Sequence, residues 1–336
     1  MRRNIFIIIL LLIFISCNRD NKNITQKQKS DKTKISELES INNKIKNNPD
    51  DPKLYNLRSR YYLQKGKIDS SYKDINKALQ LDSTNSNFYI SLSDIYLLMG
   101  KAQKCKDALL KAYKLEPNNN DGLLKLAKLY LIIKEYSKSI EFANKAIKAN
   151  DLCYEAYFIK GYTYLENADT ANAIINFQNS VNINQEYYDA YIQLANIFFN
   201  KRDDLAINYY KNALNVKPEA IEPRYNLGMI YQRKNEFEKA INTYNNIIKI
   251  NPEYKYAYYN IGYINLVYFN KYDKAIEYFT KAINIDPDYI DAYYNIGYSY
   301  ELLDNKTKAR EFYYKILKKD ENNANAIKGL NRLDNK

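Results

Sequence analysis

Tyrosine and asparagine recur together at fixed spacing in the last third of the sequence. The string Tyr-Tyr-Asn-Ile-Gly-Tyr occurs at residues 258–263 and again at 293–298. An asparagine amide can donate to and accept from an extended peptide backbone, and tyrosine rings provide rigid contact area at a low cost in entropy. The pattern therefore predicts a groove that binds an extended peptide. Its candidate residues are Tyr225, Asn226, Met229, Tyr259, Asn260, Tyr263, Tyr294, Asn295 and Tyr298.

Groups that commonly carry out catalysis are scarce in this chain. The sequence has no histidine, and histidine is the usual general base, the commonest metal ligand and the partner of the nucleophile in most hydrolytic triads. It also contains no glycine-rich phosphate loop, nucleophile elbow or metal-ligand cluster. Cys105 and Cys153 are too few to form a disulfide framework. We therefore expect no enzyme activity, no catalytic residue, no metal and no cofactor.

Carboxylates offer the one alternative route to chemistry. Paired carboxylates can serve as acid and base, as in glycosidases that would act on a cell wall. The carboxylates here recur regularly near predicted helix starts, where the helix dipole stabilises negative charge. These residues are Asp121, Glu155, Asp189, Glu222 and Asp291. The glycosidase alternative also lacks a catalytic domain to hold the carboxylates.

The sequence contains an internal repeat, and the structural elements of this repeat must hold the tyrosines in position. Small residues recur at intervals of 33 to 35 residues at Ser59, Ser93, Ala127, Gly161, Ala195, Gly228, Gly262 and Gly297. A second series of small residues runs through Ser71, Cys105, Ser139, Ala173, Ala206, Ala240, Ala275 and Ala309. A fixed period of this length is the signature of a stacked repeat architecture.

Each repeat is predicted to form two short amphipathic helices, because its apolar residues fall three, four and seven positions apart. In the sixth repeat, Gly228 and Ala240 would let the two backbones approach closely. Tyr231 and Tyr244 would fill the space beside them. Pro252 would then end the pair, because proline cannot continue a helix and restricts the residue before it.

This arrangement of tyrosine, leucine, glycine, alanine and proline resembles the tetratricopeptide repeat family over residues 52–323. The resemblance implies an all-α fold, a right-handed α-solenoid of about eight helix-turn-helix repeats with capping helices at both ends. Four residues depart from the usual pattern of the family. Arg58 and Lys160 stand where leucine is usual, Arg224 where a large aromatic residue is usual, and Asn265 where tyrosine is usual. These departures affect local packing and leave the expected fold unchanged.

The repeats and their flanks give a complete domain prediction. The predicted segments are a signal peptide at 1–16, a flexible tether at 17–34, a capping helix at 35–51, repeats at 52–85, 86–119, 120–153, 154–187, 188–220, 221–254, 255–289 and 290–323, and a closing helix at 324–336. The first capping helix carries a stripe of Ile35, Leu38, Ile41 and Ile45, and the closing helix carries Ala326, Ile327, Leu330 and Leu333. The outermost repeats of a solenoid need such caps, since they must present a polar face to water.

The amino terminus has the pattern of a targeting segment. Arg2 and Arg3 precede an apolar run at residues 5–15, which ends at Ser16 and Cys17. A membrane-spanning helix needs about 20 apolar residues, so an uncleaved signal anchor is the weaker alternative. The end of the run resembles a bacterial lipobox, which implies cleavage before Cys17 and acylation of its thiol. Several acyl chains on one residue would give stable membrane anchoring.

Export to the bacterial cell envelope follows from this lipobox. Asn18 after the modified cysteine favours the outer membrane in the enterobacterial system that the motif resembles. Removal of residues 1–16 would lower the formal net charge of +12 only slightly, so the chain stays basic. Its lysines would either attract anionic lipids and wall polymers or simply solvate the helices. Nucleic acid is an unlikely partner for an exported protein without a reading motif.

Function is expected on the first helices of the repeats, which line the inner wall of a stacked array. The tyrosine and asparagine groove lies there, although asparagine at this position is also ordinary consensus in the resembling family. The first four repeats place an apolar stripe on the same wall at Ile90, Leu97, Leu98, Leu124, Leu131, Ile132, Phe158 and Leu165. That stripe could bind a helix, form core between repeats, or mediate self-association.

The sequence thus predicts a membrane-anchored scaffold that binds peptide segments or partner proteins on its concave face. Envelope assembly, transport or maintenance would be its setting. The alternative is a structural protein that self-associates as a homo-oligomer. Recognition of an acidic chain terminus is not expected, because the neighbours of the groove asparagines are tyrosine and methionine rather than lysine or arginine.

Overall fold

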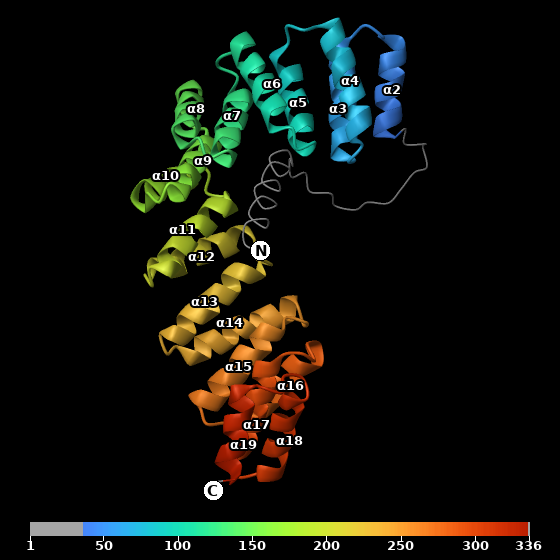
Figure 1. Cartoon of the computed structure of the whole chain (residues 1–336). Coiled ribbons are helices and arrows are strands. Elements are labelled where there is room, and N and C mark those ends of the chain that lie inside the picture. Colours follow the sequence, from blue (N-terminus) through green and yellow to red (C-terminus); the bar gives the residue numbers. More distant parts are fainter. Residues whose placement is uncertain (1–35, 335–336) are drawn as a thin grey trace, which may run out of the picture. The chain divides into compact units, whose positions relative to one another are not determined.

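The computed structural model describes residues 36–334, and these residues form eighteen α-helices and no strand (Figure 1). The predicted signal peptide, the lipidation site at Cys17 and the tether lie outside the described residues. None of the helices within 36–334 is both long enough and apolar enough to cross a membrane. The predicted all-helical solenoid of helix pairs is therefore confirmed.

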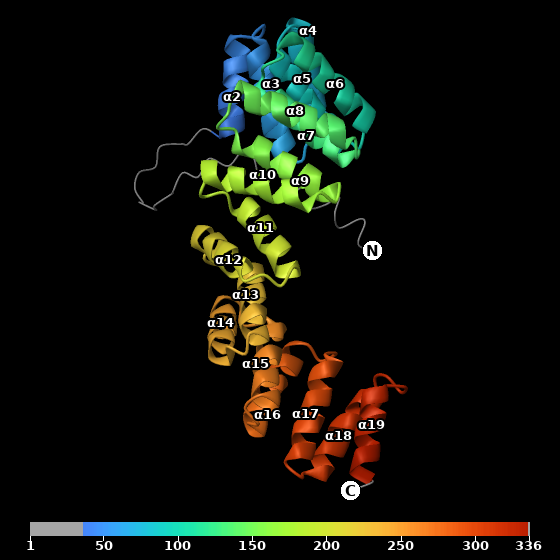
Figure 2. The same ribbon diagram turned by 90° about the vertical axis from the view of Figure 1, so that its left-hand side faces the viewer.

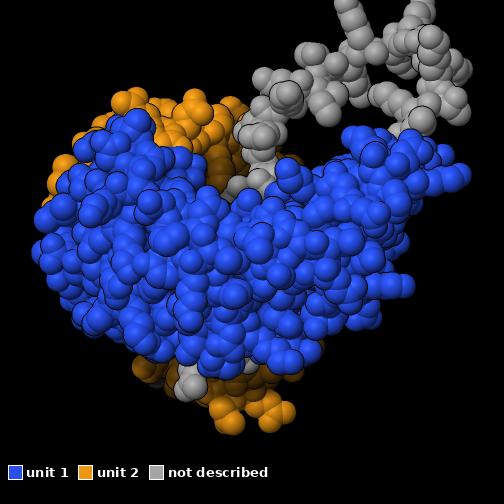
Figure 3. All heavy atoms as spheres, turned by 90° about the horizontal axis from the view of Figure 1, so that it is seen from above, with its two compact units in different colours: residues 1–183 blue, residues 184–336 orange. Residues whose placement is uncertain are grey.

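The helices divide between two compact units, residues 1–183 and 184–336 (Figure 3). Unit 1 contains α2 (Glu37–Asn47), α3 (Pro52–Gln64), α4 (Ile68–Leu81), α5 (Ser86–Leu98), α6 (Ala102–Leu115), α7 (Asn120–Ile132), α8 (Tyr136–Ala149), α9 (Tyr154–Glu166) and α10 (Thr170–Ile183). Unit 2 contains α11 (Tyr188–Asn200), α12 (Leu205–Val216), α13 (Ile221–Arg233), α14 (Phe237–Ile250), α15 (Lys255–Val267), α16 (Tyr272–Ile285), α17 (Ile290–Leu302), α18 (Lys306–Leu317) and α19 (Ala324–Asp334).

Within each unit, every helix packs most extensively against a helix next to it in the chain. In unit 2, for example, α15 pairs with α16 and α17 pairs with α18, and α19 lies beside α18 (Figure 2). The first helices of neighbouring repeats also touch one another, as α15 and α17 do. Contacts that join only sequence neighbours are the mark of a solenoid, in which each repeat is stabilised by the next.

The turn between the two helices of a repeat has one feature in common along the array. It contains a residue with positive φ in each of the eight repeats, namely Gly66, Gly100, Lys134, Ala168, Arg202, Asn235, Asn270 and Asp304. A residue in this left-handed conformation ends a helix by letting the next N–H groups bond to its last carbonyls. Lys67 N–H, for instance, donates to the carbonyl of Tyr62 at 2.9 Å. Glycine occupies only the first two of these positions, so the other six repeats hold a side chain in a strained conformation.

The small residues lie where the two helices of a repeat cross. In the first repeat, the Ser59 and Ser71 hydroxyl oxygens are 2.9 Å apart, and each hydroxyl also donates to the backbone carbonyl of the other residue at 2.8 Å. In the sixth repeat, the space beside Gly228 is taken by the ring of Tyr244, since a Cβ on the glycine would lie only 2.6 Å from that ring. Close approach of the two helices, predicted from the small residues, is therefore confirmed.

Buried aromatic rings form the centre of these repeats. Each ring comes from the second helix and packs against the glycine of the first helix. The pairs are Gly161 with Phe177, Gly228 with Tyr244, Gly262 with Phe279, and Gly297 with Tyr313. All four rings are fully buried, and rings of this size dominate core energetics.

Helices α2 and α19 cover the outer faces of their units. Ile41 and Ile45 of α2 are buried, as predicted. In α19, Leu333 is buried. In the same helix, the Ile327 side chain is 39% exposed. It stands one position after the buried Ala326, and a rotation of about 100° per residue turns it away from the array.

Three of the departures from the family pattern have visible partners. The Arg58 guanidinium forms two hydrogen bonds with Asp74, at 2.7 and 2.8 Å, and a third with Asn42 of the capping helix. Arg224 donates to two carbonyls of the preceding turn. Asn265 is buried and its amide donates to the carbonyl of Ile261 at 2.8 Å. Each polar side chain at these positions is thus hydrogen-bonded, as buried polar groups generally are.

Candidate functional site

The predicted groove residues lie on three first helices of unit 2, α13, α15 and α17. On each helix the third residue follows the adjacent first two by four and three positions, so all three share one face. α15 and α17 contact each other directly, and α13 is joined to α15 by a hydrogen bond between Tyr225 and Asn260. The structure therefore brings the predicted residues together on one wall of unit 2, and we call this wall the tyrosine wall.

A series of hydrogen bonds runs along the tyrosine wall from one repeat to the next. The Asn226 amide donates to the hydroxyl of Tyr210 at 3.0 Å. In the same way, Asn260 donates to Tyr225 at 3.2 Å and Asn295 donates to Tyr259 at 3.1 Å. The first role of these asparagines is therefore to join adjacent repeats.

The asparagines have fewer hydrogen-bonding groups available to a ligand than the sequence-based interpretation assumed. Asn295 is buried, and Asn226 and Asn260 are half-buried with one amide hydrogen already used. An asparagine has two N–H donors and a carbonyl oxygen, so a ligand could use only the remainder. Tyr210, the buried acceptor for Asn226, was missed from the sequence because it lies on the second helix α12.

Tyrosine rings make up most of the accessible part of the wall. Met229 is exposed, and Tyr263 and Tyr298 are half-buried. The rings of Tyr259 and Tyr263 stack at a centroid distance of 6.4 Å, and those of Tyr294 and Tyr298 at 6.2 Å. Stacking along one helix holds the rings in fixed positions, and such ring surfaces suit contact with another chain.

Three further tyrosines extend the wall toward the starts of the first helices. Tyr254 and Tyr289 immediately precede α15 and α17, and Tyr256 lies in the first turn of α15. The Tyr256 ring is 5.6 Å from the Tyr254 ring and 5.9 Å from the Tyr289 ring. Sequence reasoning missed these residues, although the recurrence of tyrosine eight positions before Gly262 and Gly297 was a usable signal.

The apolar stripe of unit 1 serves mainly as core. Ile90, Leu131 and Phe158 are buried, which supports the alternative that these residues pack between repeats. Leu98 is 40% exposed at the end of α5.

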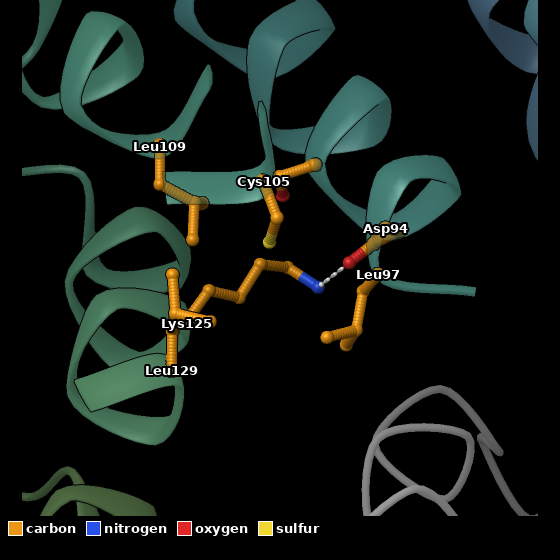
Figure 4. Close-up of a pocket in the computed structure, with 7 residues that line it drawn as sticks. Asp94, Leu97, Cys105, Leu109, Lys125 and Leu129 are labelled. Atoms are coloured by element: carbon orange, nitrogen blue, oxygen red, sulfur yellow. Dashed lines mark hydrogen bonds and ion pairs between the residues drawn. The ribbon is translucent and has the colours of Figure 1, made fainter. Parts of the chain in front are cut away.

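A small cavity in unit 1 lies between α5, α6 and α7 (Figure 4). The Lys125 ammonium from α7 points across it to the carboxylate of Asp94 on α5, with a nitrogen–oxygen distance of 2.7 Å. Burial raises the pKa of Asp94, and the charge of Lys125 opposes this shift. Cys105 lies beside the pair with a free thiol, whose pKa burial raises to about 12. This ion pair joins the second repeat to the third.

Replacing Lys125 by methionine should destabilise unit 1 by about 1 kcal/mol at pH 7, because Asp94 loses its cation while still partly accessible to water. The folded pKa of Asp94 already lies above its ordinary value, so the native state holds this proton more tightly than the unfolded state. The contribution of Asp94 to stability therefore falls as the pH rises from its ordinary pKa to its higher pKa in the folded protein. The difference between variant and wild type should be smaller at pH 4 than at pH 7.

Urea unfolding at the two pH values measures this effect. The double variant Lys125→Met with Asp94→Asn is the matched control, since it removes the charge of Asp94 together with that of Lys125 and leaves only the exposed carboxylate of Asp121. We expect it to lie closer to the wild type than the single variant at pH 7. A single variant with the same stability as the wild type at both pH values would contradict the structural role of the pair.

The described part of the chain contains no group of three or more cysteine, aspartate or glutamate side chains that could hold a metal ion. The recurring carboxylates lie in the first turns of first helices, as predicted. Asp121, Glu155, Asp189, Glu222 and Asp291 occupy the first turns of α7, α9, α11, α13 and α17. They stand one per repeat rather than as a pair around a common point, so the helix dipole accounts for their recurrence.

Comparison with known proteins agrees with this architecture. Residues 154–187, 221–254 and 291–323 each match a tetratricopeptide repeat family, and residues 266–304 match a TPR repeat family. Residues 18–128 match the C-terminal domain of CadC. The part of this range that the structure describes is built of the same helix pairs, α2 to α7. No curated protein matches the chain.

Two solved structures show the similarity of fold. The C-terminal part of a TPR repeat-containing protein from Cytophaga hutchinsonii aligns with a TM-score of 0.63 and 20% identity, over 72% of this chain and 99% of that one. PilF from Pseudomonas aeruginosa aligns with a TM-score of 0.54 and 15% identity, over 61% of this chain and 93% of that one. At these identities the likeness concerns the fold alone.

The helix pairs, their period and their sequential packing define the chain as an α-solenoid. The family matches identify tetratricopeptide repeats within it, at residues 154–187, 221–254, 266–304 and 291–323. Proteins of this class serve as scaffolds for protein–protein interaction.

Proposed function

We propose that this protein binds an extended peptide segment of a partner protein on the tyrosine wall of unit 2. The observation that carries the proposal is the row of stacked rings on neighbouring first helices, with Tyr259 beside Tyr263 on α15 and Tyr294 beside Tyr298 on α17. Rings held rigidly by packing lose little entropy on binding, and they offer both apolar faces and hydroxyl groups to a peptide.

We further propose that the protein acts at the bacterial cell envelope, in assembly, transport or maintenance. Support comes from the sequence, where Arg2, Arg3 and an apolar run precede Cys17. Acylation at Cys17 would hold the scaffold at a membrane surface, with the outer membrane favoured by Asn18. Replacing Cys17 by serine should move the protein from the membrane fraction to the soluble fraction, because the acceptor thiol is lost.

Peptide binding on the tyrosine wall can be tested with the purified chain. Tyr263 and Tyr298 would both be changed to alanine, since these half-buried rings can be removed without cutting the asparagine bonds. We expect the variant to lose partners that the wild type captures from an envelope extract. The matched control is Tyr314→Ala on the second helix α18, which removes a ring that is 52% exposed and lies away from the wall. If the wild type, the double variant and the control captured the same partners, the result would contradict the proposal.

A further inference from the structure

Five tyrosine rings gather at one end of the tyrosine wall, where the first helices of unit 2 begin. They come from α13, from α15 and from the turns that lead into α15 and α17. Their centroids lie 5.0 to 6.4 Å apart in the pairs 225–254, 225–256, 254–256, 256–289 and 259–289. Tyr256 is the most accessible of them, with 43% of its surface exposed. We call this group the tyrosine cluster; its members are Tyr225, Tyr254, Tyr256, Tyr259 and Tyr289.

Two carboxylates flank the tyrosine cluster. Glu222 precedes Tyr225 by three residues on α13, and Asp291 precedes Tyr294 by three residues on α17, so each carboxylate lies on the same helix face as the wall. Both side chains are exposed. The charges of both carboxylates also act on the phenols of the cluster. Burial raises the pKa of Tyr259, and the charge of Asp291 raises it further. Burial likewise raises the pKa of Tyr254, with a contribution from Glu222.

The charges at this end of the wall are unbalanced. Lys255 is a cation that touches the cluster, and its ammonium is already bonded to Asp286 at the end of α16. Within residues 36–334, neither Glu222 nor Asp291 forms an ion pair. Asp189 occupies the corresponding position on α11, where the charge of Lys217 acts on it, so it adds no unbalanced charge. Glu222 and Asp291 therefore leave negative charge beside the cluster that no cation of the described residues pairs with.

The rings of the cluster already hold a cation at their faces. The Lys255 ammonium lies 5.0 Å from the centroid of Tyr256 and 4.9 Å from the centroid of Tyr289. Both distances are within the range in which an aromatic face attracts a cation. The exposed part of Tyr256, between Glu222 and Asp291, offers a further aromatic surface of the same kind.

We propose that the tyrosine cluster binds a lysine or arginine side chain of the peptide that occupies the tyrosine wall. The inference rests on the proposed function and specifies the chemistry of its ligand. Ring faces would stabilise the cation, and Glu222 or Asp291 would accept hydrogen bonds from it. The rest of the wall carries apolar and aromatic surface, so the ligand is an extended segment with a basic residue among apolar ones. A segment with an acidic residue at that point is repelled.

Binding of labelled peptides to the full chain, followed by fluorescence anisotropy, tests this inference. Three peptides of identical apolar sequence would carry arginine, glutamine or glutamate at the same central positions. We expect the arginine peptide to bind about tenfold more tightly than the glutamine peptide at low salt, and the glutamate peptide to bind most weakly. The preference should shrink as salt increases, because exposed charges are screened.

Two sets of variants assign the preference to the cluster. Glu222→Gln with Asp291→Asn should abolish the preference for arginine while leaving binding of the glutamine peptide unchanged, because both changes keep the shape of exposed side chains. The matched control is Glu238→Gln with Asp273→Asn, which removes two exposed first-turn carboxylates from the second helices α14 and α16. This control should retain the preference. Tyr256→Ala should weaken binding of the arginine peptide more than binding of the glutamine peptide, and Tyr256→Phe should restore the preference for arginine.

The outcomes separate this inference from the function on which it rests. Equal binding of the arginine and glutamine peptides would overturn the cationic ligand and leave the peptide wall in place. An arginine preference that survives the loss of Glu222 and Asp291 would likewise overturn the role of the cluster in binding a cation, and it would leave the peptide wall in place. Failure of all three peptides to bind would overturn both the ligand chemistry and the proposed peptide-binding wall.

Discussion

Replacing Tyr244 by alanine is expected to lower the free energy of unfolding of unit 2 by about 3–5 kcal/mol, the range for removal of a buried aromatic ring. The ring is fully buried, and it fills the space left by Gly228 on the facing helix. Its loss would leave a cavity between α13 and α14 that the backbone can only partly close. Urea unfolding followed by circular dichroism measures the change.

Tyr244→Phe is the matched control for this cavity. It keeps the ring and removes only the hydroxyl that donates to Gln232 at 3.2 Å, so we expect a loss of about 1 kcal/mol. Phenylalanine already occupies the corresponding place in two other repeats, as Phe177 and Phe279. An alanine variant within about 1 kcal/mol of the wild type would show that the ring does not support the repeat.

Replacing Arg332 by alanine is expected to destabilise the C-terminal end of unit 2 by about 3 kcal/mol, at the lower end of the range for breaking a buried ion pair. The guanidinium bonds both oxygens of Glu301, with nitrogen–oxygen distances of 2.8 to 3.2 Å. The Glu301 side chain is only 4% exposed, whereas Arg332 is 37% exposed. The variant would therefore leave a buried carboxylate without its guanidinium, while the hydroxyl of Tyr313 would still donate to it.

Hydrogen exchange can locate this effect, because a solenoid opens from its ends. Amides of α19 should lose protection in Arg332→Ala while those of α13 keep theirs. The double variant Arg332→Met with Glu301→Gln removes both charges and keeps an acceptor for Tyr313, so its stability should return to within about 1 kcal/mol of the wild type. Unchanged protection of α19 in the single variant would show that the ion pair does not hold the closing helix.

Both predictions concern one type of contact, the hydrogen bond from a buried tyrosine of the second helix to a side chain of the first helix. The contact recurs in several repeats, and the accepting group differs among them. Tyr210, Tyr244 and Tyr313 are the buried rings of their repeats, and each hydroxyl donates to a polar side chain of the first helix. The acceptors are Asn196, Gln232 and Glu301. In the last repeat the acceptor is a carboxylate, which allows Arg332 of the closing helix to bind it as well.

Much of the fold was predictable because its contacts are local. A period of about 34 residues, the small residues and the apolar spacing led to helix pairs, and the structure confirms them. Each repeat meets mainly its sequence neighbours, so a pattern within two repeats contains most of the information on packing. Which side chains of α19 are buried, such as Ala326 rather than Ile327, depends on a single residue of helical rotation.

The candidate site was predictable only in part. The sequence placed Tyr225, Tyr259 and Tyr294 on one wall, because equivalent positions of a regular array share a face. It did not show that Asn260 and Asn295 donate to tyrosines of the preceding repeat. Those bonds depend on the distance and angle between neighbouring first helices, which residue spacing does not specify.

The sequence by itself determined the class of structure, the number of repeats and the helices on which a ligand would be sought, since helical periodicity and small residues are local properties of the chain. Only the tertiary structure decided which of these side chains remain available. Packing buried Asn295 and left Tyr256 exposed between Glu222 and Asp291. The physical reason is that burial and charge balance depend on the neighbours that each side chain meets after the repeats have stacked.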